Sequence, residues 1–403
     1  MKERRYDIDW LRVIAMLTVF FFHCSRFFCT EEWHLKVPVA QQSEVLRIVR
    51  DMLVGVWFME LFFLVSGFAS WYALKSRSGR QYLGERVKRL VVPLYIVGLF
   101  VLVVPQQYFD GITKGYITGG FWQWLPSYYT RLPAAMLANW VPWLDPASLL
   151  PFPFTGHLWF IRTLFVVSLV TLPALQYLRS EQGKRFIDRL AGWVDRPGGI
   201  FLFLIPLAIA QIALRWIPNL PDRTWSEFVW YALYFLIGYI FAADERFTVS
   251  VKRYTWLCLA LWIGVYVVMG SVVFLILQLE PSEGSGFSGL YLVYVTSWTV
   301  ISWSAIVFML SLGARYLNFS NRFLTYSNEA VLPFYLFHQT IILTVGWFVL
   351  PWDINNLAKY LVIVAISFSL IMALYEGFVR HIGFMRVLFG MAPQKKGPAA
   401  PAG

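Results

Sequence analysis

Long apolar stretches separated by short polar segments run through most of this 403-residue chain. A helix that crosses a membrane needs about 20 mainly apolar residues. The stretches of that length are continuous rather than alternating, which favours helices over the strands of a membrane barrel. We predict ten spans, at 10–29, 54–74, 90–109, 158–178, 199–217, 225–242, 254–278, 290–312, 329–350 and 358–380.

The composition agrees with this pattern. Hydrophobic residues make up 58% of the chain and charged residues 14%, and the mean hydropathy is +0.58. Soluble domains contain about 45–50% apolar and about 25% charged residues. We therefore predict an all-α, polytopic membrane helical bundle in one domain, residues 1–390. The Pro-, Ala-, Gly- and Lys-rich tail at 391–403 is predicted to be disordered and cytoplasmic.

The net charge of +11 reflects basic residues in the connecting segments rather than a surface that binds nucleic acid. With the N-terminus placed inside, 23 of the 34 lysines and arginines fall in inside segments and 7 in outside segments. The other 4 lie in spans or at their edges. Because positive residues collect on the cytoplasmic side of membrane proteins, both termini are predicted to be cytoplasmic.

The sequence contains no pattern typical of a metal site or a disulfide scaffold. The three cysteines, Cys24, Cys29 and Cys258, are widely scattered and are predicted to be buried thiols. Neither a Gly-rich phosphate loop nor a serine-hydrolase elbow occurs. Metal-dependent and serine-hydrolase functions therefore have no support, and His34 and His381, in predicted loops, receive no role.

The first span carries polar residues on one helical face. Arg12 and His23 are eleven residues apart, close to three turns, which separates them by about 16 Å along the axis. Asp9 falls on the same stripe. Charged side chains in a span cost a few kcal/mol, so each requires a reason. Arg12 is either an interfacial snorkelling residue or part of a site, and His23 is either a packed structural residue or a catalytic one.

Two further charged residues lie at the depth of His23. Glu60 is in the second predicted span and Arg162 is in the fourth, shortly after His157. They form either a structural ion pair between helices or a polar pocket. In such a pocket Glu60 would orient His23, and Arg162 would offset developing negative charge. Whether these faces meet in space is left open by the sequence.

A second basic group precedes the third span. Arg86 and Arg89 are three residues apart and face the same way at the predicted cytoplasmic mouth. They either form a fork for phosphate oxygens or set the topology, with Glu85 paired to Arg89.

Polar or small residues inside two other spans can be explained by contacts between helices. Tyr335 and His338 share a face of the ninth span, where polar contacts between helices are the usual reason for such residues. Ser66 and Gly67, in the second span, suggest a small-residue helix contact. The outer segment at 110–157 is rich in aromatic residues, and it forms either an interfacial belt or a platform for sugar rings or lipid.

Several of these motifs together resemble those of the membrane acyltransferase-3 family, including its glucan-modifying, succinyltransferase-like branch. The resemblance covers Asp7 to about Arg380 and depends on five motifs in this order. They are Arg12-x10-His23, Phe62-Phe63-Leu64-Val65-Ser66-Gly67-Phe68, Arg86-x-x-Arg89, Gly156-His157-Leu158-Trp159-Phe160 and Tyr335-Leu336-Phe337-His338.

This resemblance implies a multi-pass enzyme of the cell inner (plasma) membrane. Such an enzyme transfers an acyl group from cytoplasmic acyl-CoA, here acetyl-CoA or succinyl-CoA, to a hydroxyl of an extracytoplasmic glycan or glycolipid. His23 would be the catalytic base or acyl relay and Arg12 would be needed with it. Arg86 and Arg89 would contact the donor phosphates. Ser66, His157, Tyr335 and His338 lie in the matched motifs and would belong to the same pocket. Arg162 and Glu60 join this pocket by their depth alone, and Glu60 departs from the family pattern.

The main alternative is a multi-pass transporter or flippase for a glycan, lipid or organic anion, in which intramembrane Arg and His line a path. Such proteins often contain paired broken helices in two halves, and the sequence contains no such pair. A non-catalytic membrane scaffold would not require Arg12 and His23 on one face. Consumption of acyl-CoA distinguishes the enzyme from both, with no permanently bound cofactor or metal expected.

Overall fold

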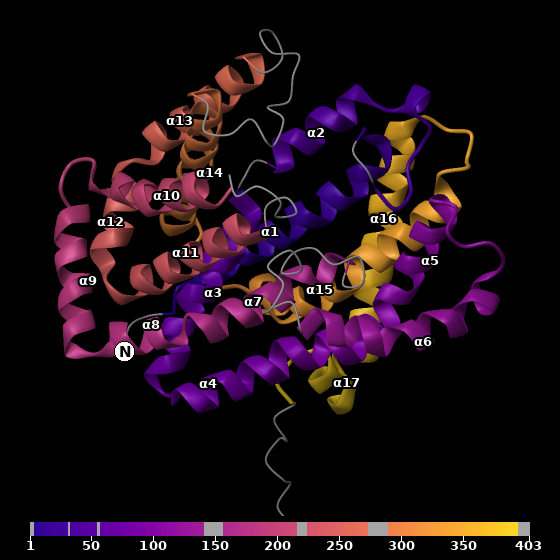
Figure 1. Ribbon diagram of the computed structural model, residues 1–403, viewed down its shortest axis with the longest axis horizontal. Helices are drawn as coiled ribbons and strands as arrows, with labels where there is room; N and C mark the ends of the chain where they lie inside the picture. Colours follow the sequence, from indigo (N-terminus) through magenta and orange to yellow (C-terminus); the bar gives the residue numbers. More distant parts are fainter. Residues whose placement is uncertain are drawn as a thin grey trace, which may run out of the picture.

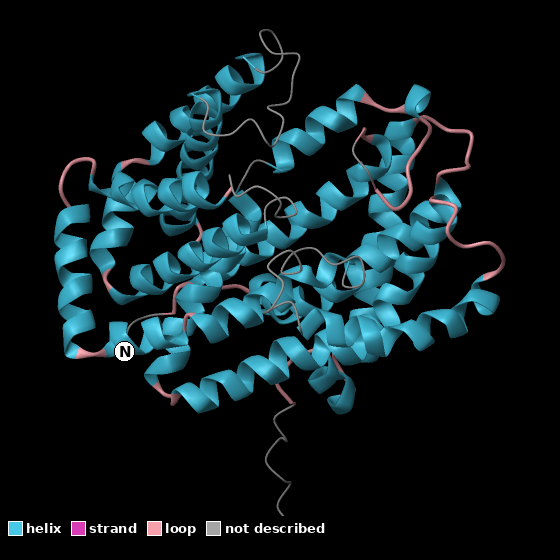
Figure 2. Ribbon diagram, in the orientation of Figure 1, coloured by secondary structure: helices cyan, strands magenta, loops and turns pink. Residues whose placement is uncertain are grey.

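The computed structural model describes residues 4–30, 33–54, 57–140, 156–215, 224–272 and 289–393. All regular structure in these ranges is helical, and they contain no strand (Figure 1, Figure 2). The first half contains α1 Tyr6–Ser25, η1 Arg26–Phe28, η2 Val39–Gln41, α2 Glu44–Val54, α3 Phe58–Lys75, α4 Gly79–Arg86, η4 Val87–Val91, η5 Pro93–Leu102, α5 Val103–Thr113, α6 Phe121–Trp140, η8 Gly156–Leu158, α7 Trp159–Val170, α8 Leu172–Arg179 and α9 Glu181–Val194.

The second half begins with a short 3₁₀ helix and ends with a short helix after the last long one. Its elements are η9 Gly199–Phe203, α10 Leu204–Leu214, α11 Thr224–Ala243, α12 Glu245–Arg253, α13 Thr255–Val272, α14 Gly289–Tyr316, α15 Arg322–Val349, α16 Asn356–Leu374, η11 Tyr375–Val379 and α17 Gly383–Leu388. Of the predicted tail at 391–403, residues 394–403 lie outside the described part of the chain.

Among the described residues, six helices are long and apolar enough to cross a membrane, or up to eight if each of two bent pairs is one span. The all-helical, multi-span architecture is thus confirmed, with a smaller number of qualifying helices than the ten predicted. The predicted spans 54–74 and 199–217 are the two without a counterpart. The first contains α3, which carries Glu60 and Lys75, and the second overlaps the short apolar segment Gly199–Leu214.

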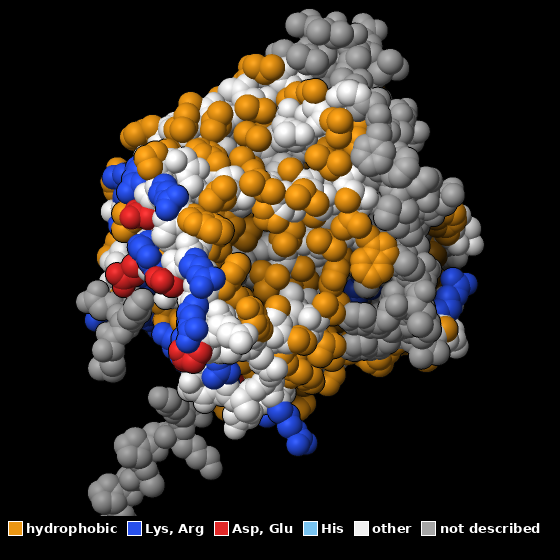
Figure 3. Space-filling model, turned by 60° about the vertical axis from the view of Figure 1, so that its left-hand side comes forward, with side chains coloured by type: hydrophobic (Ala, Val, Ile, Leu, Met, Phe, Trp, Pro, Cys, Tyr) orange, Lys and Arg blue, Asp and Glu red, His pale blue; other side chains and the backbone are white. Residues whose placement is uncertain are grey.

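The surface agrees with burial in a bilayer. Figure 3 shows a broad face of hydrophobic side chains bordered at one edge by basic and acidic ones. Large hydrophobic side chains are exposed on several of the candidate spans; Val267, Leu361 and Phe348 are 56%, 56% and 66% exposed. A soluble protein rarely exposes apolar patches of that extent, whereas a lipid-facing surface requires them.

Helix α1 lies across the middle of the bundle in Figure 1 and packs against α2, α3, α14, α15 and α16. Its side chains are accordingly buried on most sides, including Leu11, Phe20 and Cys24. The prediction that all three cysteines are buried is confirmed, and all three are free thiols. The central position of α1 places both Arg12 and His23 inside the protein rather than against lipid.

Helices α3 and α11 approach each other so closely that only glycine fits at two positions. A Cβ on Gly67 would lie 1.8 Å from the carbonyl oxygen of Phe235, and one on Gly238 would lie 1.9 Å from that of Leu64. The predicted small-residue contact at Ser66–Gly67 is therefore confirmed. Close backbone approach through small residues is the usual way that membrane helices pack.

One helical run continues from Gly79 to Thr113 and includes the π-helical segments η4 and η5. Side chains from other helices bond to its carbonyl oxygens. Tyr128 of α6 donates to Leu99 O at 2.6 Å, and Thr340 of α15 donates to Leu102 O at 2.6 Å. π-helical turns are rare in proteins, and those that occur are often found at functional sites.

Part of the aromatic outer segment predicted at 110–157 is the helix α6. Tyr128 is buried and Trp124 packs beside it, with ring centroids 5.6 Å apart, whereas Trp122 is 79% exposed. Residues 141–155, which include Trp143, lie outside the described residues. The inner face of α6 thus packs on the bundle, and its outer face is available to lipid or solvent.

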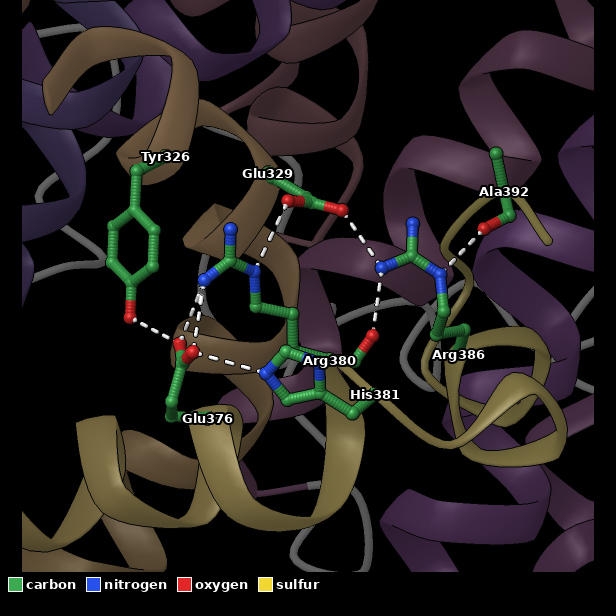
Figure 4. Close-up of polar contacts among 7 residues, drawn as sticks. All are labelled: Tyr326, Glu329, Glu376, Arg380, His381, Arg386 and Ala392. Carbon is green, nitrogen blue, oxygen red and sulfur yellow. Dashed lines mark hydrogen bonds and ion pairs between the residues drawn. The ribbon is translucent and has the colours of Figure 1, made fainter. Parts of the chain in front are cut away.

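The C-terminal segment is tied to the bundle by the polar cluster in Figure 4. Arg386 Nη1 lies 2.8 Å from Glu329 Oε1, and its Nε donates to the carbonyl of Ala392 at 2.9 Å. Glu376 accepts from Tyr326 at 2.9 Å and from Arg380 at 2.9 Å. The Arg386 contact holds α17 against the start of α15, and the Glu376 contact with Tyr326 ties η11 to the same part of α15.

Candidate active site

A cavity of about 760 Å³ lies beside α1 and contains most of the predicted site residues. Its walls come from α1, η1 and the loop after it, α3, η4, α5, η8, α7 and α15. The cavity is lined by the predicted site residues Arg12, His23, Ser66, His157, Tyr335 and His338. Sequence positions more than 300 residues apart are therefore brought into one chamber.

Much of the chamber wall is apolar. It is formed by Met16, Val19, Phe62, Leu90, Phe160, Leu164, Val331 and Leu332. Because α1 is one uninterrupted helix from Tyr6 to Ser25, the two polar residues are separated by about 16 Å along its axis. The chamber thus runs from a basic group, past apolar walls, to an imidazole.

His23 and His338 form a direct contact at the centre of the site. Nε2 of His338 lies 3.3 Å from Nδ1 of His23, and the ring centroids are 5.0 Å apart. The Nδ1 of His338 faces the carbonyl of Tyr335 at 2.5 Å, and the Nδ1 of His23 faces the carbonyl of Val19 at 2.9 Å. Each Nδ1 therefore carries the proton, because a carbonyl only accepts.

This arrangement fixes the tautomer of His23. Its Nδ1–H points to Val19 O and His338 Nε2, so in the neutral ring Nε2 is the unprotonated nitrogen. Among the described residues Nε2 has no hydrogen-bond partner, and the side chain lines the chamber. The site therefore presents a basic nitrogen to whatever occupies the cavity.

His157 supports the same centre from η8. Its ring meets that of His338 edge-on, with centroids 4.8 Å apart, and its Nε2 donates to the carbonyl of Leu336 at 3.1 Å. Its own carbonyl accepts from the hydroxyl of Tyr335 at 2.5 Å. These contacts place His157 and Tyr335 as neighbours that hold His338 in position.

Arg12 lies at the opposite end of the chamber. Its Nη1 donates to Asn328 Oδ1 at 3.0 Å and lies 3.7 Å from Asp9 Oδ1. Asp9 is shared with Arg4, which donates to it at 2.8 Å. The side chain of Arg12 remains 27% exposed, so this basic end is accessible to a charged ligand.

Arg86 and Arg89 lie on the helical run that begins at Gly79, and neither lines the chamber. Arg86 turns inward and donates to Ser70 Oγ at 2.6 Å, with its guanidinium 5.0 Å from the ring of Tyr82. Arg89 is exposed. Glu85, which the sequence offered as a partner of Arg89, bonds instead to Arg77 at 2.7 Å.

Glu60 and Arg162 are placed apart from the histidines. The carboxylate of Glu60 accepts from Trp230 Nε1 at 3.1 Å, on the side of α3 that faces α11. Arg162 is buried on α7. Neither residue lines the chamber, although their neighbours Met59 and Ile161 do. Because one residue turns an α-helix by about 100°, Glu60 points away from the chamber face to which its neighbour Met59 contributes.

The part of the chamber beyond His23 contains polar residues to which the sequence assigned no role. His34 donates through Nδ1 to Asp110 Oδ1 at 3.1 Å, and Lys114 lies 3.1 Å from the same oxygen. The amide of Gln339 lies 3.0 Å from Nε2 of His34. Trp33 stacks on His23 with centroids 5.3 Å apart. The position of Gln339, next to His338, was the one available signal for this group.

Comparison with known proteins agrees with this geometry. The glucans biosynthesis protein C of Salmonella paratyphi A, of Salmonella agona and of Salmonella enteritidis are each 25% identical to this chain. The similarity extends over 402 residues, 98% of this chain and 96% of each relative. No solved structure matches the chain. The family model described as an acyltransferase domain matches residues 5–376, and the chain therefore belongs to the acyltransferase-3 family.

Proposed function

We propose that this protein is a membrane-embedded O-acyltransferase that moves an acyl group from acyl-CoA to a hydroxyl of an extracytoplasmic glycan. The observation that carries the proposal is the His23–His338 pair, which presents His23 Nε2 as a base in a chamber with a basic far end. Family membership supports acyl transfer, and the name of the relatives supports a glucan as acceptor.

The donor enters at the basic end. The phosphates of CoA are costly to bury, so they stay beside Arg89 and Arg12, with Arg86 behind them. A pantetheine arm of roughly 15–20 Å, from the reach of an extended chain, spans the apolar walls as far as His23. Acetyl-CoA and succinyl-CoA are the donors that we favour.

The reaction then needs one base and no further cofactor. His23 Nε2 takes the proton of the acceptor hydroxyl while the oxygen of that hydroxyl attacks the thioester carbonyl. The C–S bond breaks, and the departing thiolate receives that proton from His23 to leave as CoA. His338 accepts from His23 Nδ1–H throughout, which stabilises the positively charged ring. An acyl relay on His23 would use the same nitrogen as a nucleophile.

The membrane arrangement follows from the charge pattern. We propose that the protein spans the inner (plasma) membrane, with both termini and the Arg12 end of the chamber cytoplasmic. Helices α3 and α10 would then complete a ten-span topology with the eight candidate segments. The Asp110 end of the chamber would face outward, toward the acceptor.

A direct test uses purified protein in lipid bilayers with acetyl-CoA and succinyl-CoA, with and without a neutral glucan. Release of CoA is measured for the wild type, for His23→Gln and for the exposed control His381→Gln. We expect release that His23→Gln abolishes and the control retains. Release that persists in His23→Gln contradicts the assigned base. Transport of a glycan or organic anion without CoA release would favour the transporter alternative.

A further inference from the structure

We propose that the polar cluster beyond His23, formed by Asp110, His34, Gln339 and Lys114, is the binding site for the hydroxyl groups of a neutral carbohydrate acceptor. This inference rests on the proposed function and adds the residues that recognise the second substrate. None of the four residues belongs to the motifs that carry the family resemblance.

The cluster is assembled from three separate parts of the chain. Asp110 and Lys114 come from the end of α5, His34 from the loop after η1, and Gln339 from α15. Asp110 Oδ1 lies 3.1 Å from His34 Nδ1 and 3.1 Å from Lys114 Nζ. The side-chain nitrogen of Gln339 lies 3.0 Å from His34 Nε2. Their positions are therefore fixed before any ligand enters, which lowers the entropic cost of binding.

All four side chains line the same chamber as the histidine pair. Gln339 directly follows His338, and His34 directly follows Trp33, whose ring stacks on His23. His34, Asp110 and Lys114 remain 18%, 24% and 39% exposed, so they keep capacity for further hydrogen bonds. A hydroxyl-rich ligand held here would place one hydroxyl beside His23.

The chemistry of this end differs from that of the Arg12 end. At the Arg12 end a guanidinium lines the chamber and Arg4 shares Asp9 with it, which suits an anionic donor. Here a carboxylate, an ammonium, an imidazole and an amide alternate, and Arg26 lies over the ring of Trp33 at 4.7 Å. A site that contains both hydrogen-bond donors and acceptors suits hydroxyl groups, because a hydroxyl both donates and accepts. The Arg12 end of the chamber thus suits the anionic donor, and the Asp110 end suits the neutral acceptor.

An ion pair kept only for stability would explain this cluster poorly. Partly exposed salt bridges contribute about 0–1 kcal/mol, and these bridge the wall of an open chamber rather than a packed core. The line of hydrogen bonds continues from Gln339 to Gln106 at 3.3 Å and from Gln106 to His157 at 3.2 Å. Binding at the cluster therefore contacts the same network that supports His338.

The test measures acyl transfer to a neutral glucan oligosaccharide, free or linked to an alkyl chain, with hydrolysis of acyl-CoA followed in parallel. Asp110→Asn and Gln339→Leu are compared with the matched control Asp188→Asn, an exposed residue of α9. We expect each variant to raise the KM for the glucan about tenfold, as the loss of a hydrogen bond to a charged or buried group does, with the KM for acyl-CoA unchanged.

An unchanged KM for the glucan, or equal losses for both substrates, would overturn the proposal. A lower KM for the alkyl-linked sugar than for the free one would identify a glycolipid as the source. A wild type that hydrolyses acyl-CoA but acylates neither sugar would overturn this acceptor site alone. A wild type that releases no CoA under any condition would instead overturn the proposed function.

Discussion

Nε2 of His338 lies 3.3 Å from Nδ1 of His23, across a sequence separation of 315 residues. The contact joins the first and the ninth predicted spans at the centre of the chamber. It makes His338 a positioning residue, because it acts on the orientation and tautomer of His23 rather than on a substrate.

Replacing His338 should therefore lower kcat and leave KM for acyl-CoA unchanged. We expect His338→Phe to reduce kcat by about 10²–10⁴-fold, the range for a disturbed general base, because His23 Nδ1–H loses its imidazole acceptor and keeps only the carbonyl of Val19. His338→Gln supplies an amide oxygen at a similar distance and should recover part of the rate. The pH–rate profile should shift in the Phe variant, and a profile identical to the wild type would indicate a purely structural role.

The two arginines that precede the third predicted span should respond differently. Arg89 is exposed, so Arg89→Ala should raise the KM for acyl-CoA without changing the melting temperature. Arg86 bonds to Ser70, so Arg86→Ala should raise the KM and also lower stability by about 1–3 kcal/mol. Arg80→Ala, exposed on α4, is the control for charge loss. Equal KM values for all three variants would assign these arginines to topology.

Contact between α3 and α11 should tolerate no side chain at Gly67. Gly67→Ala places a Cβ against the Phe235 carbonyl and should destabilise the protein by about 1–3 kcal/mol or more, as overpacking does. Gly84→Ala, where nothing lies within 4 Å, is the matched control. Thermal unfolding in detergent provides the measurement. A Gly67→Ala protein as stable as the control would contradict the close approach.

Loss of the Arg386 contacts should loosen the C-terminal segment. Arg386 is 8% exposed and bonds to Glu329 and to two backbone carbonyls, so Arg386→Met should destabilise docking of α17 by about 1–3 kcal/mol. Limited proteolysis should then cleave after residue 380 faster than in the wild type. Lys184→Met, in an exposed pair with Glu181, should change nothing. Equal cleavage rates would mean that α17 is held by its apolar contacts.

Orientation can be read from single cysteines. Trp122 is 79% exposed on α6, so Trp122→Cys should react with an impermeant reagent in intact cells. Arg80→Cys should react only after lysis. The three native cysteines are buried and give low background. The reverse pattern would invert the proposed topology.

Much of this architecture could be predicted from the sequence because membrane helices are specified locally. Each apolar stretch indicates a helix by its own length, and the stripe of Arg12 and His23 follows from helical periodicity alone. The number of residues to the outer end of each span also predicts Glu60 at the level of His23. It failed to place them together because depth says nothing of rotation, and Glu60 faces Trp230 on α11.

The contact between His23 and His338, and the cluster around Asp110, could not be predicted in this way. Both depend on how helices distant in sequence are arranged, and His34 lies in a loop whose course no periodicity describes. The ten predicted spans likewise exceeded the helices that qualify by length and hydropathy, since α3 retains Glu60 and Lys75.

The helical run from Gly79 to Thr113 carries Arg89 near one end and Asp110 near the other. They are 21 residues apart in the sequence, which is about 31 Å at the rise of an α-helix. One added or deleted residue would turn everything beyond it by about 100° and swing Asp110 away from the chamber, unless a π turn absorbed it. Insertions and deletions in this stretch should therefore cost more activity than conservative substitutions, because they change the register between Arg89 and Asp110.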